Sequence, residues 1–84
     1  MARFQALVEV QLRPGISDPQ GATIQRSLPA LGISGVSSVR AGKAFRVELD
    51  AADEDAARSL VETLSERILA NPVIESSSVS LQAL

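Results

Sequence analysis

The chain has 84 residues, of which 45% are hydrophobic and 21% are charged, with a net charge of −2 at pH 7. This length and composition are typical of one small globular domain, which we place at residues 1–84. The nearly balanced charge and the presence of only two aromatic residues disfavour nucleic-acid binding, which needs a basic surface or stacking platforms.

Residues 4–12 alternate between hydrophobic and polar side chains. The hydrophobic set is Phe4, Ala6, Val8, Val10 and Leu12. Because side chains of a strand point alternately to its two faces, this pattern predicts a strand with one buried face.

A first helix is predicted from Asp18 onward. An Asp side chain caps free backbone N–H groups, and Pro19 is accepted at the first helical position. Gly32 predicts the end of the helix, and Pro29 predicts a bend or an irregular last turn before it. The residues expected on its buried side are Ile24, Leu28 and Leu31.

Residues 36–50 allow two interpretations. Five hydrophobic residues share one parity on both sides of Gly42: Val39, Ala41, Phe45, Val47 and Leu49. A two-residue turn at Gly42 and Lys43 would put Val39 and Arg46 on the same face, which the parity excludes. The segment is therefore predicted either as one long strand that bends at Gly42 or as a hairpin with an odd-length loop.

The second helix follows Asp53, which is expected to cap it. The hydrophobic stripe predicted on this helix consists of Ala57, Leu60, Val61, Leu64 and Ile68. Asn71 and Pro72 predict its end, since the residue before proline is pushed away from helical angles. Residues 73–81 then predict an edge strand, with Val73, Val79 and Leu81 on one side.

The predicted order of strand, helix, long or split strand, helix and strand indicates an α+β fold. We expect a two-layer sandwich of ferredoxin-like character. Its antiparallel sheet would have three long or four strands, with two helices on one face.

No catalytic, cofactor or metal signature is found. The chain has no histidine and no cysteine, and its five glycines match no nucleotide-binding spacing. The carboxylates near Asp53 are better explained as stabilising the first turn of a helix than as a magnesium site. We therefore expect no catalytic, cofactor or metal residue in this chain.

The motifs "DPQG" at 18–21, "VRAGKAF" at 39–45 and "ANPVIES" at 70–76 together make the chain resemble the PurS family. PurS is the small subunit of phosphoribosylformylglycinamidine synthase in purine biosynthesis. The likeness covers nearly the whole chain. Two positions depart from the family pattern, Ala22 where lysine is frequent and Ser77 where an aromatic residue is common.

The resemblance implies a non-catalytic subunit that bridges a glutaminase subunit and a large synthetase subunit, with a role in ammonia transfer between them. The complex uses ATP and magnesium, which this chain is not expected to bind. On this reading Arg40, Gly42 and Lys43 form a surface that a partner protein contacts. A regulatory domain of ACT type that senses a small molecule is the alternative function.

Two further expectations concern the state of the protein. A domain of this length buries only roughly 60 to 65% of the surface of its unfolded chain, so we expect a homo-oligomer, either a dimer or a tetramer. The sequence has no long hydrophobic stretch, so we expect no membrane association and a cytoplasmic protein.

Overall fold

The computed structural model describes all residues, 1–84. Its elements are β1 (Ala2–Leu12), α1 (Pro19–Ser27), β2 (Gly42–Ala51), α2 (Glu54–Leu64) and β3 (Glu75–Ala83). A 3₁₀ turn at Pro29–Leu31 follows α1, as Pro29 predicts, and a π-helical turn at Ser65–Leu69 follows α2. None of the helices is both long enough and hydrophobic enough to cross a bilayer.

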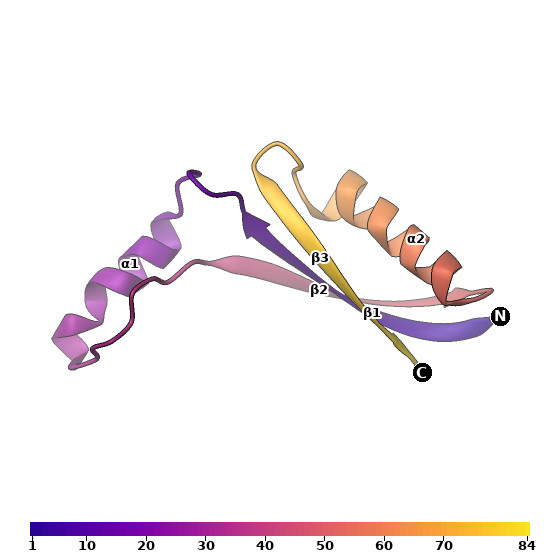
Figure 1. The fold of residues 1–84 in the computed structure, drawn as a ribbon, viewed down its shortest axis with the longest axis horizontal. Coiled ribbons are helices and arrows are strands. Elements are labelled where there is room, and N and C mark those ends of the chain that lie inside the picture. Colours follow the sequence, from indigo (N-terminus) through magenta and orange to yellow (C-terminus); the bar gives the residue numbers. More distant parts are fainter.

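The three strands form one antiparallel sheet with β1 in the centre and β2 and β3 at its edges (Figure 1). Val8 of β1 lies opposite Phe45 of β2 and Val79 of β3. Since side chains alternate along each strand, this register turns the hydrophobic sides of all three strands to the same face. The α+β class, the antiparallel sheet and the edge position of β3 are confirmed.

The core lies between β1 and α2. Ala6, Val8 and Val10 of β1 are at most 1% exposed and form one buried cluster with Val61 of α2, while Phe4 of β1, 5% exposed, packs with Ala51 and Ala57 in a second cluster. Asp53 caps α2 as predicted, because its carboxylate accepts a hydrogen bond of 2.8 Å from the backbone N–H of Ala56.

The hydrophobic stripe predicted on α2 is only partly buried. Ala57 and Val61 face the sheet, but Leu60 is 55% and Ile68 is 73% exposed. The π-helical turn explains Ile68, because its wider winding brings the fifth residue rather than the fourth back to the same side. Leu69 therefore packs on the core in place of Ile68.

Residues 36–50 form neither the bent strand nor the hairpin that the sequence allows. β2 is a single strand that begins at Gly42 and pairs with β1 along its whole length. A Cβ atom at Gly42 would lie 2.8 Å from the carbonyl oxygen of Val10, so glycine lets the two backbones approach closely where the pairing starts.

The last strand begins later than the sequence predicts. Val73 is 79% exposed and lies in a turn, and β3 starts at Glu75. The side chain of Asn71 accepts a hydrogen bond from the N–H of Val73, and its carbonyl accepts one from Glu75. These bonds close the turn, so Val73 cannot join the sheet.

The sequence predicts both helices on the sheet, but the structure places only α2 there. α1 lies beyond the end of the sheet and makes the molecule elongated, with extents of 53 × 27 × 14 Å (Figure 1). The radius of gyration is 16.5 Å, whereas a compact domain of this length has about 12 Å. The physical cause is a set of hydrogen bonds that hold α1 against residues 37–41.

Candidate functional site

The three sequence motifs meet at one end of the sheet. β1 ends there at Leu12, β2 begins there at Gly42 and β3 begins there at Glu75. We call this region, made of residues 18–21, 39–45 and 70–76, the motif end. Segments that lie far apart in the chain are thus combined into one surface.

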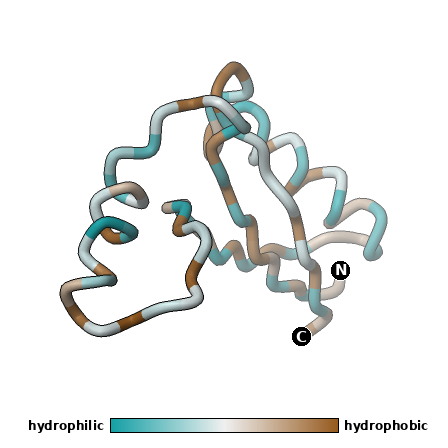
Figure 2. Tube along the Cα trace, turned by 60° about the vertical axis from the view of Figure 1, so that its left-hand side comes forward, coloured by the Kyte–Doolittle hydropathy of each residue, from teal (hydrophilic) through white to brown (hydrophobic).

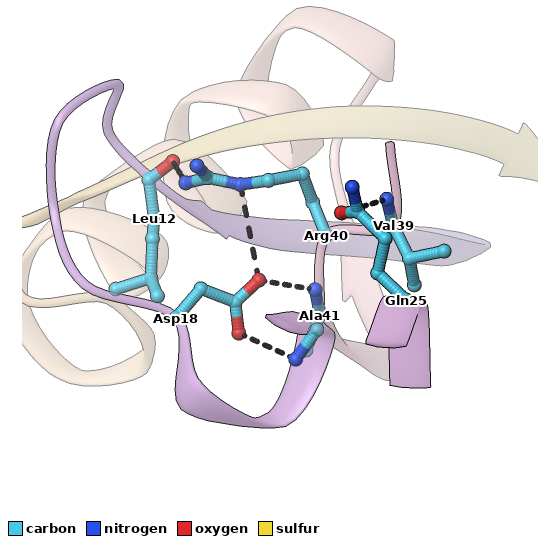
Figure 3. Close-up of polar contacts among 7 residues, drawn as sticks. Leu12, Asp18, Gln25, Val39, Arg40 and Ala41 are labelled. Carbon is cyan, nitrogen blue, oxygen red and sulfur yellow. Dashed lines mark hydrogen bonds and ion pairs between the residues drawn. The ribbon is translucent and has the colours of Figure 1, made fainter. Parts of the chain in front are cut away.

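Asp18 is the central residue of the motif end, and its side chain is only 8% exposed. One carboxylate oxygen accepts a hydrogen bond of 3.0 Å from the N–H of Gly21, which caps α1 as predicted. The other oxygen accepts one of 2.8 Å from the N–H of Ala41 (Figure 3). One side chain therefore fixes the start of α1 to the residues that precede β2.

Gly21 and Gln25 extend this connection along α1. Gly21 is buried, and a Cβ atom at this position would lie 2.6 Å from the carbonyl oxygen of Val39. The side-chain oxygen of Gln25 accepts a hydrogen bond of 3.2 Å from the N–H of Val39, and its amide donates one of 3.4 Å to the carbonyl of Ser37 (Figure 3). The helix and residues 37–41 therefore form one unit.

Arg40 lies over the same carboxylate. Its Nε atom is 3.8 Å from Asp18 Oδ2, and its guanidinium donates a hydrogen bond of 3.4 Å to the carbonyl of Leu12 (Figure 3). The side chain remains 48% exposed. Arg40 is thus held by the protein and still offers part of its guanidinium to the surface.

Lys43 has a comparable position as the second residue of β2. Its ammonium lies 3.5 Å from the carboxylate of Glu75 and 5.9 Å from the ring centre of Phe45. Glu75 also accepts a hydrogen bond of 2.7 Å from the N–H of Asn71, so it ties the "ANPVIES" turn to β2. The side chain of Lys43 is 50% exposed and that of Glu75 is 14% exposed.

Gly42 lies between these two cations and has a shallow hollow on each side. One, of about 390 Å³, is bordered by Glu9, Gln11 and Ala44. The other, of about 340 Å³, is bordered by Leu12, Asp18 and Glu75. Arg40 borders the first hollow only, and Lys43 borders both.

The electrostatics of the motif end favour protein contact over anion binding. Both cations predicted as partner contacts are paired with carboxylates of the chain itself, so neither offers an unbalanced positive charge. No cluster of three or more acidic side chains is arranged to hold a metal ion. What the surface does present is half-exposed long side chains on a fixed backbone, which is the character of an interface rim.

Arg40, Gly42 and Lys43, the residues predicted as partner contacts, lie together around one hollow. Gln25, Asn71 and Glu75 belong to the same region and were not predicted individually from the sequence. Glu75 and Asn71 belong to the "ANPVIES" motif, so the motif itself could have indicated them. Gln25 lies in no motif. Its hydrogen bonds to Ser37 and Val39 could not be predicted from the hydrophobic pattern of the sequence.

The stability of the protein is expected to depend on the ionisation of Asp18. Hydrogen bonds from Gly21 and then Ala41, with Arg40 nearby, hold the pKa of its carboxyl below the usual value, although burial acts in the opposite direction. A carboxyl with a lower pKa in the folded state stabilises the fold at neutral pH. This stabilisation begins to fall near the unfolded pKa of about 3.9 and is lost as the pH drops through the folded pKa.

An Asp18→Asn variant tests this expectation by chemical unfolding at a series of pH values. The parent should be more stable than the variant at neutral pH, and the difference should shrink below about pH 4. All other carboxylates are common to both proteins and cancel in the comparison. A difference that stays constant down to about pH 3 would contradict this role of Asp18.

Known proteins resemble this chain over nearly its whole length, including the three motifs. The family model described as PurS, phosphoribosylformylglycinamidine (FGAM) synthase, matches residues 5–83. The phosphoribosylformylglycinamidine synthase subunit PurS of Mycobacterium leprae is 41% identical over 83 residues, which cover 99% of each chain. The subunit PurS of Synechocystis is 40% identical over 81 residues, 96% of this chain and 81% of that protein.

Solved structures agree with the sequence comparison. Thermus thermophilus PurS is 34% identical and superposes with a TM-score of 0.87 over 98% of both chains. A chain in the structure of PurLQS from Thermotoga maritima is 33% identical and has a TM-score of 0.87 over 100% of both chains. With a family model matched over nearly its whole length and relatives above 30% identity, the chain belongs to the PurS family of phosphoribosylformylglycinamidine synthase.

Proposed function

We propose that this chain is the PurS subunit of phosphoribosylformylglycinamidine synthase and acts in purine biosynthesis. It supplies no catalytic residue and binds no cofactor itself. It joins the glutaminase subunit to the large synthetase subunit, which uses ATP and magnesium, and it helps the transfer of ammonia between them. This role places the protein in the cytoplasm.

The single observation that supports this proposal most strongly is the match to a chain of the PurLQS structure over the full length of both chains. Because the match covers both chains completely, every segment of this chain has a counterpart in that structure. The geometry agrees, because the motif residues build a fixed surface rather than a site of reaction. The alternative of a regulatory domain of ACT type has no comparable support.

The motif end is the proposed contact surface for the other subunits. Arg40, Gly42 and Lys43 lie there side by side, and the two cations are about half exposed. The intramolecular partners Asp18 and Glu75 hold both side chains in place before a partner arrives. Pre-ordered side chains lose less conformational entropy on binding, which favours association.

Replacing Arg40 and Lys43 together with alanine is expected to weaken assembly with the glutaminase and synthetase subunits. Charges at the rim of an interface act mainly on the association rate, which should fall roughly 3- to 10-fold, and more at low salt. Stability should change by only about 1 kcal/mol per ion pair, because both cations are about half exposed and each carboxylate keeps its hydrogen bonds to backbone N–H groups. Glutamine-dependent synthesis should fall more than synthesis fed by free ammonium, since only the former needs the glutaminase.

The matched control removes the same charge elsewhere, by replacing Arg3 and Arg46 on the opposite face of the sheet with alanine. Biolayer interferometry with the two larger subunits, in the presence of glutamine and Mg-ADP, gives the association rates. Equal rates for both double variants and the parent would show that Arg40 and Lys43 only stabilise a charged turn.

A further inference from the structure

The end of α2 is wound differently from the rest of the helix. Residues 65–69 form a π-helical turn, in which the N–H of Ala70 donates a hydrogen bond of 2.9 Å to the carbonyl of Ser65. The hydroxyl of Ser65 is buried and lies 2.6 Å from the hydroxyl of Ser77, so the start of the turn is fixed to β3. Turns of this kind are rare and are frequently found at functional sites.

Two adjacent hydrophobic residues can fill the same place beside the core. Val61 is fully buried and marks the side of α2 that faces the sheet. At about 100° per residue, a regular helix would carry Ile68 only about 20° from the direction of Val61. The π winding instead turns Leu69 to the core and leaves Ile68 73% exposed. Isoleucine and leucine replace one another in cores at small cost, so either residue can occupy the place.

The winding of this turn is connected to the motif end through Asn71. The N–H of Asn71 donates a hydrogen bond of 2.7 Å to one carboxylate oxygen of Glu75, and the other oxygen lies 3.5 Å from the ammonium of Lys43. If the helix continued with regular α winding, Asn71 would be rotated by about 100° around the helix axis. Its N–H would then turn away from Glu75, and the carboxylate beside Lys43 would lose this bond.

The connection between α2 and β3 is held mainly by hydrogen bonds. Residues 71–73 are all exposed, so packing on the core does not fix them. Figure 2 shows that this connection, at the top of the molecule, is itself partly hydrophobic. Single hydrogen bonds contribute little net free energy, because water replaces them when they break. A change of winding at the end of α2 is therefore within reach of the folded protein.

We propose that the end of α2 switches between two registers. In the π register Leu69 packs on the core, and Asn71 holds Glu75 beside Lys43. In the α register Ile68 takes the place of Leu69, and Glu75 is released. Because coupling between two sites is reciprocal, a partner subunit that contacts the fixed Lys43 also stabilises the packing of Leu69. This last step rests on the proposed function, whereas the two registers do not.

Urea unfolding of alanine variants tests the registers without any partner. Ile68→Ala should have little effect because the side chain is exposed, and Leu69→Ala should be partly compensated because Ile68 moves into the vacated place. The double variant should raise the unfolding equilibrium constant at least about fivefold more than the product of the two single effects. Leu60→Ala combined with Leu69→Ala is the matched control, since Leu60 is also exposed but cannot replace Leu69, and these effects should multiply. Multiplicative effects in both pairs would overturn the switch.

Hydrogen exchange at the N–H of Asn71 reports the register itself. Leu69→Ala favours the α register and should accelerate this exchange at least about fivefold. Adding Ile68→Ala should bring the rate back to within about twofold of the parent, because neither register then buries a large side chain. Simple loosening of the core predicts the opposite order, so faster exchange in the double variant than in Leu69→Ala would refute the switch.

Binding to the larger subunits tests the connection to Lys43. Leu69→Ala should slow association about 2- to 3-fold, which is less than the effect of removing both Arg40 and Lys43, and adding Ile68→Ala should restore the rate. If exchange at Asn71 follows the expected order and association does not, the coupling between register and partner surface is refuted. The proposed function would be unaffected by that result, because the variants of Arg40 and Lys43 test it independently.

Discussion

Replacing Phe4 with alanine is expected to lower the free energy of unfolding by about 3 to 5 kcal/mol. Phe4 is 5% exposed and packs in a cluster whose other buried members are Ala51 and Ala57. Alanines have no side-chain freedom with which to fill the space, so most of the cavity would remain. Leu49 and Leu81 at the border of the cluster are the only larger side chains that could move inward.

An effect of this size is large for such a small domain. With about 0.05 to 0.15 kcal/mol per residue, 84 residues give a total stability of roughly 4 to 13 kcal/mol. At the lower end of this range the Phe4→Ala variant would be largely unfolded, whereas at the upper end it would remain folded with about 8 to 10 kcal/mol of stability. Urea unfolding followed by circular dichroism measures the change, at one protein concentration for all variants because association stabilises the folded state.

Leu7→Ala provides the matched control for Phe4→Ala. Leu7 lies on the same strand but on the opposite, largely polar face, and it is only partly buried. Its truncation should cost about 1 kcal/mol. Similar losses for the two variants would mean that the hydrophobic face of β1 has been assigned incorrectly.

The sequence predicts β1 well because its hydrophobic and polar residues alternate, and every second residue from Phe4 to Val10 is buried on one face. It predicts α2 less well for a geometrical reason. Regular helical spacing assigns Ile68 to the buried stripe, but the π-helical turn shifts the winding after Leu64 and turns Leu69 inward. Leu60 follows the predicted spacing and is nevertheless exposed, because the stripe is wider than the part of the sheet that α2 covers.

The start of β2 illustrates a different limit. The parity of Val39, Ala41 and Phe45 is compatible with a continuous strand, and nothing local marks where pairing begins. Pairing begins at Gly42 because the backbone of Val10 approaches there and because Asp18 and Gln25 engage Ala41 and Val39. The bond between Asp18 and Ala41 spans 23 residues, so no local pattern contains it.

The position of α1 is the part of the fold that sequence patterns reproduce least. Ile24, Leu28 and Leu31 predict a helix with a buried side; the helix forms over Pro19–Ser27, but that side is not buried, because Ile24 is 43% and Leu31 is 70% exposed. Periodicity reports how hydrophobic residues are spaced along the helix, but not whether the sheet of the same chain covers them. The hydrogen bonds at the motif end decide the position of α1, because they hold it beside residues 37–41 and beyond the end of the sheet.

Gly21→Ala tests the hydrogen bonds that join α1 and its cap to Val39 and Ala41. The substitution has two opposing effects on stability, a gain in helix propensity and a steric clash with Val39. In an ordinary helical position the change from glycine to alanine would stabilise the helix by up to about 1 kcal/mol. Here the new Cβ atom would lie 2.6 Å from the carbonyl oxygen of Val39, far inside the optimal contact distance of about 3.5 to 4.0 Å. Val39 and Ala41 are both held by side chains of α1 or its cap, so the backbone can retreat only by giving up those bonds.

We therefore expect Gly21→Ala to destabilise the protein by about 1 to 3 kcal/mol, the usual cost of overpacking. Hydrogen exchange at the N–H of Ala41 should accelerate, since its bond to Asp18 is the one that a retreat of residues 39–41 lengthens. The neighbouring exposed position supplies the control: the difference between Gln20→Gly and Gln20→Ala gives the helix propensity without the contact. If Gly21→Ala raises stability by as much as that difference and leaves exchange at Ala41 unchanged, the close approach of the two segments does not hold α1 in place.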